Sequence, residues 1–312
     1  MAGFSIIVCC YNSSKRLPET IAHFSKLDLN DDNEIEVIIV DNASTDDTTT
    51  VAIEEGRKFK GLKNYTVLKE LTPGKSSALR KGIREAKYEY IIICDDDNWL
   101  DADYITEAAK LMQKYPTAGV IGGLSVAAFE LGTKPDWFDD YHGVYAIGSQ
   151  YPNDGIITKE KGYVFGAGSV WRTSVLLAIT ETPQVLTCRV GNKLSSAGDT
   201  ELCYKAIILG YDIVYSSKLK FTHFMPAARL TKAYIKRFYE DSAPDMVHLH
   251  GLLYQSGIQQ KMFNSSIKRT WWGQALAIIK NTILNKNNSF KLSYIQFKEL
   301  CRMNWKYDKS FK

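Results

Sequence analysis

Three consecutive carboxylates, Asp95–Asp97, directly follow a strongly apolar run, Tyr90–Cys94. Acidic side chains at the tip of a buried strand repel one another, and removing them from water costs free energy unless a cation compensates. Carboxylate oxygens are the ligands that Mg²⁺ and Mn²⁺ prefer. We therefore expect a divalent metal here. The alternative is a solvated turn in which Asp101 and the other acids cap a helix that begins near Ala102.

The elements that must position these acids are predicted strands alternating with segments of helical periodicity. The predicted strands of the first 125 residues are Ser5–Cys10, Glu36–Val40, Tyr65–Leu68, Tyr90–Cys94 and Gly119–Leu124. The predicted helices between them are Leu17–Leu27, Thr45–Lys58, Ser76–Ala86 and Ala102–Tyr115. This alternation predicts an α/β fold with a mostly parallel sheet and helices on both faces.

Polar side chains follow three of the predicted strands. Asn12, Asp41 and Asp95–Asp97 each come just after an apolar run. In open α/β sheets, ligands bind beyond the carboxyl ends of the strands. We therefore expect these side chains to converge on one crevice.

The chain after residue 125 is less regular. Residues 125–165 are rich in aromatic residues, Gly and Pro, which is compatible with a mobile loop over a site or with a loop packed on the core. A strand is predicted at Val164–Trp171, where Gly166 and Gly168 suggest close approach of backbone or ligand. The remaining predicted elements are a helix at Asp199–Leu209, short strands at Ile213–Tyr215 and Lys220–His223, and largely helical structure from Thr231 onward.

Charge is unevenly distributed along the 312 residues, which suffice for one large domain or two small ones. Ile258–Lys312 holds 11 Lys and Arg against 2 Asp and Glu, a net charge of +9, and the remainder carries −5. The basic end suits an anionic surface. The six cysteines form no C-x-x-C pair, which points to a reducing compartment. The start lacks a secretory signal and no apolar run reaches membrane-spanning length, so we expect a cytoplasmic protein.

Five motifs, in order, resemble the family 2 glycosyltransferases of GT-A fold. They are SIIVCCYN at 5–12, VDNASTD at 40–46, GKSSAL at 74–79, CDDD at 94–97 and GDTEL at 198–202. The resemblance covers residues 4–225 and implies a Rossmann-like GT-A catalytic domain at 1–230, followed by a helical C-terminal extension at 231–312. It implies inverting, metal-dependent transfer of a glycosyl group from a nucleotide diphosphate sugar, expected to be a UDP-sugar. The acceptor would be a hydroxyl of a glycan or of a lipid-linked molecule in surface polysaccharide biosynthesis.

The resemblance also implies a metal site at the diphosphate. Asp95 and Asp97, the first and third residues of the family's D-x-D element, would hold Mn²⁺ or Mg²⁺ against it. Asp96 would approach the ribose or the metal-bound waters. His223 is the candidate third ligand, because related enzymes place a histidine after a late strand. The alternative for His223 is a core histidine with its hydrogen bonds satisfied.

The nucleotide end of the site is expected at five other residues. Asp41 matches the family's base-binding aspartate, although an Asx-turn before Asn42 is an alternative. Tyr11 could stack on the base or pack in the core. Asn12, Lys75 and Arg80 are candidate nucleotide contacts. For Lys75 and Arg80 the alternative is a solvated helix face.

Asp199 stands in the place of the family's catalytic aspartate. It would take the proton of the acceptor hydroxyl during in-line attack, and a single displacement inverts the anomeric centre. The alternative is a helix N-cap. The family often has Glu-Asp at this point, whereas this chain has Gly198 before the aspartate.

Two other functions remain open alternatives. A sugar nucleotidyltransferase would share the α/β sheet and the acidic metal site, but it usually carries a Gly-rich phosphate loop after the first strand. A non-catalytic sugar-nucleotide-binding module would not need Asp95, Asp97 and Asp199 together. We expect no nucleic-acid partner.

An amphipathic segment, Ile267–Leu284, lies in the basic end of the chain. Trp271, Trp272 and several aliphatic residues fall on one side of its helical projection, with Lys and Arg residues beside and opposite them. Such a helix could lie in the interface of an anionic membrane, which would place the protein peripherally on the inner face of the plasma membrane. The alternative is that this face packs on the catalytic domain.

Overall fold

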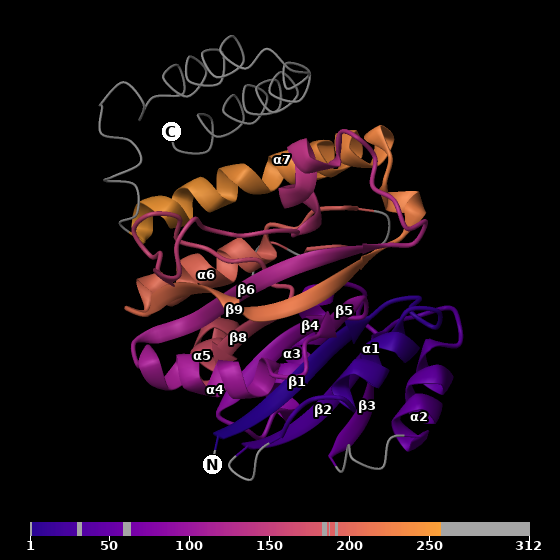
Figure 1. Cartoon of the computed structure of the whole chain (residues 1–312). Helices are drawn as coiled ribbons and strands as arrows, with labels where there is room; N and C mark the ends of the chain where they lie inside the picture. Colours follow the sequence, from indigo (N-terminus) through magenta and orange to yellow (C-terminus); the bar gives the residue numbers. More distant parts are fainter. Residues whose placement is uncertain are drawn as a thin grey trace.

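The computed structural model describes residues 2–29, 33–58, 64–182, 186, 188–190 and 193–256. The described strands form a single nine-stranded sheet in the order β3-β2-β1-β4-β8-β6-β9-β5, with β7 paired to β9. Helices cover both faces of this sheet, and one long helix, α7, crosses above its far end (Figure 1). The predicted α/β class is therefore confirmed.

The first half of the sheet is parallel. It consists of β1 (Ala2–Cys10), β2 (Asn33–Asn42), β3 (Tyr65–Glu70) and β4 (Tyr90–Asp95). Cys10 pairs with Asp41 and Cys9 pairs with Asp95. The carboxyl ends of β2 and β4 therefore flank the end of β1, and the polar residues that follow these strands lie at one edge of the sheet.

The second half of the sheet mixes parallel and antiparallel pairs, so the sheet is less uniformly parallel than expected. Its strands are β5 (Asn98–Leu100), β6 (Ala118–Phe129), β7 (Gly155–Ile156), β8 (Ser169–Arg172) and β9 (Asp212–Met225). β6 and β9 run parallel, whereas β8 is antiparallel to β4 and β6. β5 pairs antiparallel with β9 and places Asn98 opposite His223.

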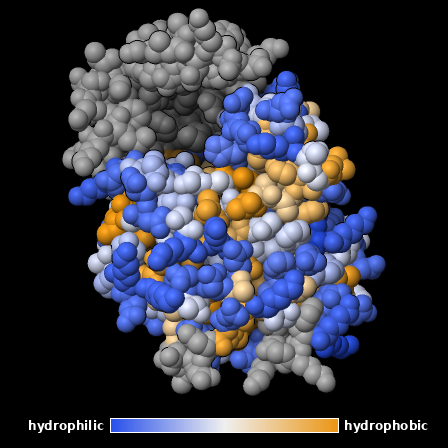
Figure 2. Space-filling model, in the orientation of Figure 1, coloured by the Kyte–Doolittle hydropathy of each residue, from blue (hydrophilic) through white to orange (hydrophobic). Residues whose placement is uncertain are grey.

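Alternating side chains of β1 enter two separate hydrophobic layers. Phe4, Ile6 and Val8 join α1 (Leu17–Phe24), α2 (Thr48–Lys58) and α4 (Tyr104–Lys114) on one face. Ile7 joins α3 (Lys75–Glu85), α5 (Thr173–Glu181) and α6 (Gly198–Ile208) on the other face. The outward sides of α1, α2 and α4 are mostly hydrophilic (Figure 2), as expected for helices that bury one apolar stripe.

A third hydrophobic cluster joins α7 (Lys232–Gln255) to the irregular region before β7. Ile235 of α7 packs with Phe138 and Tyr145 of a 3₁₀ helix, η1 (Phe138–Tyr145), and with Met225 at the end of β9. Phe138 and Tyr145 are 2% and 4% exposed. This part of the 125–165 region is therefore a loop packed on the core, one of the two predicted alternatives.

Three predicted elements differ from the structure. The strand predicted at 164–171 begins only at Ser169, because Gly168 adopts a left-handed φ of +65° that ends the preceding loop. The two short strands predicted at 213–215 and 220–223 are one strand, β9, with an irregular register. The helices α5 and η1 were not predicted.

Helical structure after Thr231 is described up to residue 256. The remainder of the predicted extension, including the segment Ile267–Leu284, lies outside the described residues. Within the described part of the chain, none of the helices combines the length and the apolar character that crossing a bilayer requires.

Candidate active site

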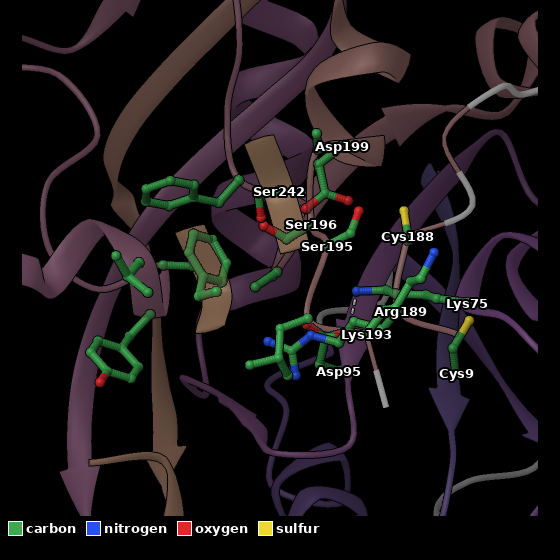
Figure 3. A pocket seen from close by; sticks show the side chains of 18 of the residues that line it. Cys9, Lys75, Asp95, Cys188, Arg189, Lys193, Ser195, Ser196, Asp199 and Ser242 are labelled. Atoms are coloured by element: carbon green, nitrogen blue, oxygen red, sulfur yellow. Dashed lines mark hydrogen bonds and ion pairs between the residues drawn. The ribbon is translucent and has the colours of Figure 1, made fainter. Parts of the chain in front are cut away.

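A cavity of about 670 Å³ lies beyond the carboxyl ends of β1, β2 and β4. Its wall also includes residues of η1, the 163–167 loop, the start of α6, the end of β9 and helix α7. Figure 3 shows labelled side chains of β1, α3, β4, α6, α7 and the residues before α6 gathered around a common space. A cavity of this size is typical of a small-molecule site.

Lys75 connects two carboxylates of the cavity. Its Nζ lies 2.5 Å from Oδ1 of Asp95, and it interacts electrostatically with Asp199. Burial alone would lower the pKa of Lys75, but Asp95 and Asp199 outweigh that effect and raise it. Lys75 is therefore a fixed cation of the cavity, and the solvated-helix alternative predicted for it is wrong.

Asp97 is paired with two basic side chains, His223 near the end of β9 and Arg229 in a 3₁₀ helix, η2 (Ala227–Arg229), that follows β9. Oδ1 lies 3.2 Å from Nε2 of His223, and Oδ2 accepts a 2.9 Å hydrogen bond from Nη1 of Arg229. Burial would raise the pKa of Asp97, but His223 and Arg229 outweigh it and hold the pKa well below its usual range. Asp97 is therefore ionised, and the pairing of β5 with β9 is what brings His223 to it.

His223 is buried but only half satisfied. The residue is 7% exposed and lines the cavity. Its Nδ1 has no hydrogen-bond partner among the described residues. The alternative of a fully satisfied core histidine therefore does not hold. Nε2 of His223 faces the Asp97 carboxylate, and imidazole nitrogens together with carboxylate oxygens are suitable ligands for a divalent metal.

Asp96 faces a third cation. Nη2 of Arg16 lies 2.5 Å from Oδ2 of Asp96, and the Thr20 hydroxyl donates to the Asp96 carbonyl oxygen at 2.9 Å. Burial raises the pKa of the Asp96 carboxyl, the neighbouring Asp97 adds to this rise, and Arg16 opposes it. Each acid of the triplet thus has its own basic partner.

The acids 95–97 do not cap a helix, so that alternative is wrong. They are followed by β5, and α4 begins later, at Tyr104. The residue before α4 is Asp103, and it makes no side-chain capping hydrogen bond. Asn98 shapes the turn, because its Oδ1 accepts from the Asp95 N–H at 3.1 Å and its Nδ2 donates to Asp97 Oδ1 at 3.3 Å.

Asp199 is held by a backbone group rather than by its own helix. α6 begins at Gly198, so Asp199 lies inside the first turn and the cap position belongs to Ala197. Oδ2 of Asp199 accepts a 3.0 Å hydrogen bond from the Gly166 N–H. A β-carbon at Gly166 would stand 2.3 Å from Oδ1 of Asp199, so the close approach predicted at this glycine is present. The N-cap alternative is wrong.

The environment of Asp199 suits a proton acceptor. Burial raises the pKa of its carboxyl, Lys75 opposes this rise, and Asp95 adds to it. Asp199 lines the same cavity as Asp95 and Asp97. A carboxylate with a raised pKa in a cavity is a candidate general base.

The predicted nucleotide residues are only partly brought together. Tyr11 lines the cavity and is 49% exposed, so the core-packing alternative is wrong. Asn12 and Asp41 lie outside the lining and organise the turns: Asn12 Oδ1 accepts from the Thr45 N–H at 2.8 Å, and Asp41 accepts from Thr49. Arg80 also lies outside the lining.

The residues that sequence reasoning missed come from distant parts of the chain. Arg16 and Arg229 pair with Asp96 and Asp97 across 80 and 132 residues. No local pattern marks either arginine, because each is selected by its position in the fold. Tyr234 and Phe238 of α7 also line the cavity and lie beyond the motifs.

The donor atoms needed for a divalent metal are present, but they are not gathered into a preformed cage. In the part of the chain that the structure describes, no group of three or more His, Cys, Asp or Glu side chains is close enough to hold a metal ion. Two carboxylates, together with phosphate oxygens of a substrate, are nevertheless a usual way to bind Mg²⁺. Asp95 and Asp97 fit that arrangement by their chemistry.

The glycosyl transferase family 2 model matches residues 5–176, which is more than half of the chain, so the chain belongs to this family. Poly-beta-1,6-N-acetyl-D-glucosamine synthase of Staphylococcus epidermidis is 31% identical over 121 residues, covering 39% of this chain and 28% of that protein. Poly(ribitol-phosphate) beta-N-acetylglucosaminyltransferase TarS of Staphylococcus aureus is 29% identical over 115 residues, covering 37% and 20%. The aligned regions therefore span less than a third of these relatives.

Solved structures share the fold over most of the chain. TarS 1–349 in complex with UDP-GlcNAc superimposes with a TM-score of 0.58 at 18% identity, covering 96% of this chain and 80% of that one. A mannosyltransferase from Pyrobaculum calidifontis in complex with GDP-Man and Mn²⁺ gives 0.60 at 18% identity, covering 97% and 86%. These likenesses confirm the predicted GT-A type of fold. Family membership also favours glycosyl transfer over the nucleotidyl-transfer alternative.

Proposed function

We propose that this chain transfers a glycosyl group, with inversion, from a UDP-sugar to a hydroxyl of a glycan or lipid-linked acceptor in surface polysaccharide biosynthesis. The observation that carries the proposal is that Asp199 and the acids 95–97 line one cavity, with Lys75 between Asp95 and Asp199. The candidate general base, Asp199, therefore lies in the same cavity as the acids that would hold a metal ion against the diphosphate.

The proposed reaction is a single displacement. The Asp199 carboxylate accepts the proton of the acceptor hydroxyl while the oxygen attacks the anomeric carbon. The bond between that carbon and the diphosphate oxygen breaks, and the nucleotide diphosphate leaves. Lys75 contributes positive charge near the leaving group, where fixed electrostatic stabilisation is most effective.

The proposal includes a divalent cation, Mn²⁺ or Mg²⁺, held by Asp95 and Asp97 with His223 as a further ligand. A bound cation would neutralise charge on the diphosphate. Support comes from the donor set and from the Mn²⁺ named in the mannosyltransferase complex. UDP-GlcNAc is the first donor to test, because the TarS complex contains it, and GDP-mannose is the second. We propose that the protein works in the cytoplasm.

A thermal-shift screen of nucleotide sugars, with and without Mn²⁺, tests this proposal. A ligand that binds only the folded state raises the melting temperature. We expect a UDP-sugar to raise it in the presence of Mn²⁺, and we expect Asp97→Asn to remove the Mn²⁺-dependent part of the shift. Asp103→Asn, at an acid outside the cavity lining, is the control and should respond like the unaltered protein. A shift with nucleoside triphosphates but with no nucleotide sugar would contradict the proposal.

A further inference from the structure

Arg229 presents a positive charge to Asp97, one of the two acids proposed to hold the metal. Its Nη1 donates to Oδ2 of Asp97 at 2.9 Å. On the other oxygen, Nε2 of His223 lies 3.2 Å from Oδ1, and Nδ2 of Asn98 donates to Oδ1 at 3.3 Å. Both oxygens of Asp97 are therefore already in contact with side chains of the protein itself.

The two acids differ in how open they are to a cation. Asp95 meets Lys75 through Oδ1, and the Asp95 side chain is 24% exposed. The side chain of Asp97 is only 3% exposed, and that of Arg229 beside it is 21% exposed. A cation can therefore reach Asp95 beside Lys75, whereas it gains Oδ2 of Asp97 when Arg229 gives up its contact.

A guanidinium and an imidazole behave differently toward a metal. The guanidinium of arginine has five N–H donors and no acceptor, and it stays protonated in proteins, so Arg229 cannot become a ligand. A neutral imidazole offers a lone pair, so His223 can stay in place as a ligand. Arg229 and a divalent cation repel each other strongly at a buried site, where the low dielectric strengthens charge interactions. They therefore compete for the same carboxylate oxygen.

The backbone of Arg229 is fixed, so the side chain is the part that can move. The Arg229 N–H donates to the Pro226 carbonyl oxygen at 2.9 Å, and the Arg229 carbonyl oxygen accepts from the Tyr145 hydroxyl at 3.0 Å. Among the described residues, the guanidinium donates a hydrogen bond to Asp97 alone. A guanidinium with unused donors can exchange one anion for another by rotation of its side chain.

The diphosphate of the proposed donor is the anion that suits this exchange. Arg229 lines the cavity in which that diphosphate would bind, and guanidinium groups bind phosphate oxygens as well as carboxylates. A divalent cation alone offers Arg229 no replacement for Asp97. Displacing the guanidinium would then leave a partly buried charge without a partner, which costs free energy.

We propose that Arg229 determines the metal affinity of the site. It competes with the divalent cation for Asp97, and it yields when a nucleotide diphosphate supplies the guanidinium with another anion. The metal and the nucleotide diphosphate therefore each raise the affinity for the other, as thermodynamic linkage requires. This inference rests on the proposed function, since it concerns the metal and the donor of that reaction.

A titration with Mn²⁺ alone, followed by electron paramagnetic resonance, tests the competition. We expect the unaltered protein to bind Mn²⁺ weakly and Arg229→Gln to bind it roughly tenfold more tightly, within the range that coupling between ligands usually spans. Arg84→Gln, at an exposed position of α3, is the control and should bind Mn²⁺ like the unaltered protein. A purely structural role for Arg229 predicts the opposite result, because Asp97 would lose a group that holds it in place.

A double variant shows whether the gained affinity belongs to Asp97. We expect Asp97→Asn, added to Arg229→Gln, to remove the gain. Equal or weaker Mn²⁺ binding by Arg229→Gln than by the unaltered protein would overturn the inference, and so would a gain that survives Asp97→Asn. If Arg229→Gln fails to fold, Arg229→Met replaces it, because methionine is also uncharged and packs as a flexible apolar side chain.

A crystal structure of the unaltered protein with UDP and Mn²⁺ gives a test that needs no variant. We expect Mn²⁺ at Asp97 and the Arg229 guanidinium away from Oδ2. Mn²⁺ bound elsewhere, or Mn²⁺ at Asp97 with Arg229 still on Oδ2, would overturn the inference. The affinity for UDP, measured in parallel by calorimetry, separates the two proposals. A protein that does not bind UDP would contradict the proposed function, and the titration with Mn²⁺ alone would still decide the role of Arg229.

Discussion

Lys75 sets the charge balance of the cavity because it faces Asp95 and Asp199 together. It opposes the rise in the pKa of Asp199 that burial causes. A carboxyl that acts as base must be ionised, so turnover should fall as the pH decreases through its pKa. The position of this acidic limb in the pH–rate profile therefore reports the effect of Lys75 on Asp199.

We expect Lys75→Met to move the acidic limb of kcat to higher pH. Without the lysine, the pKa of Asp199 rises further, and protonation stops the reaction at a pH where the unaltered enzyme still works. The measurement is kcat against pH for both proteins. Lys81→Met, on the same helix but hydrogen-bonded to the Lys69 carbonyl, should leave the limb in place. A limb that stays in place in Lys75→Met would show that Lys75 does not act on the base.

Gly166 positions Asp199 through its N–H and through its lack of a side chain. Gly166→Ala should displace Asp199 and lower kcat by roughly tenfold or more, the loss expected for a misplaced catalytic group. The affinity for UDP should stay unchanged. Gly168→Ala is the matched comparison: its β-carbon would meet Phe221 in the core at 2.6 Å, so it should lower the melting temperature instead. Similar effects of both changes on kcat would contradict a specific role for Gly166.

At the scale of elements, the turn between β4 and β5 orients the side chains of Asp95–Asp97. Asn98 is fully buried and bonds to both Asp95 and Asp97. Asn98→Ala leaves the Asp95 N–H without its acceptor, and we expect it to lower the free energy of unfolding by about 1–3 kcal/mol. Denaturant unfolding measures this change. A midpoint equal to that of the unaltered protein would mean that the turn holds its shape without Asn98.

The predictability of the elements differs between the two halves of the sheet. The parallel half was predicted because β1, β2 and β4 contain apolar runs that polar residues follow directly in sequence. The cations Arg16 and Arg229 were not predicted. Arg229, for example, follows β9 in the chain, and the pairing of β5 with β9 helps to bring it to Asp97. β5 itself is three residues long, too short for any period to show. The part of the cavity lining that α7 supplies depends on packing between α7 and η1, which local patterns do not encode.

At the scale of the whole molecule, the basic end of the chain is expected to dock the enzyme on an anionic membrane. We expect co-sedimentation with anionic liposomes that weakens as salt is added, since screening reduces the attraction of the +9 segment. Trp271→Ala together with Trp272→Ala should reduce binding further. The segment lies outside the described residues, so this remains a prediction. Protein that stays in the supernatant at low salt would favour packing of the segment on the catalytic domain.

The central claim for the whole molecule is that one cavity binds a nucleotide sugar and uses Asp199 to activate the acceptor. The most direct measurement compares donor affinity and acceptor-dependent turnover in the unaltered protein and in Asp199→Asn. The prediction is an unchanged affinity for the donor with Mn²⁺, and turnover lower by about two to four orders of magnitude, the usual contribution of a positioned base. Near-normal turnover in Asp199→Asn, or an equal loss of donor binding and turnover, would contradict it.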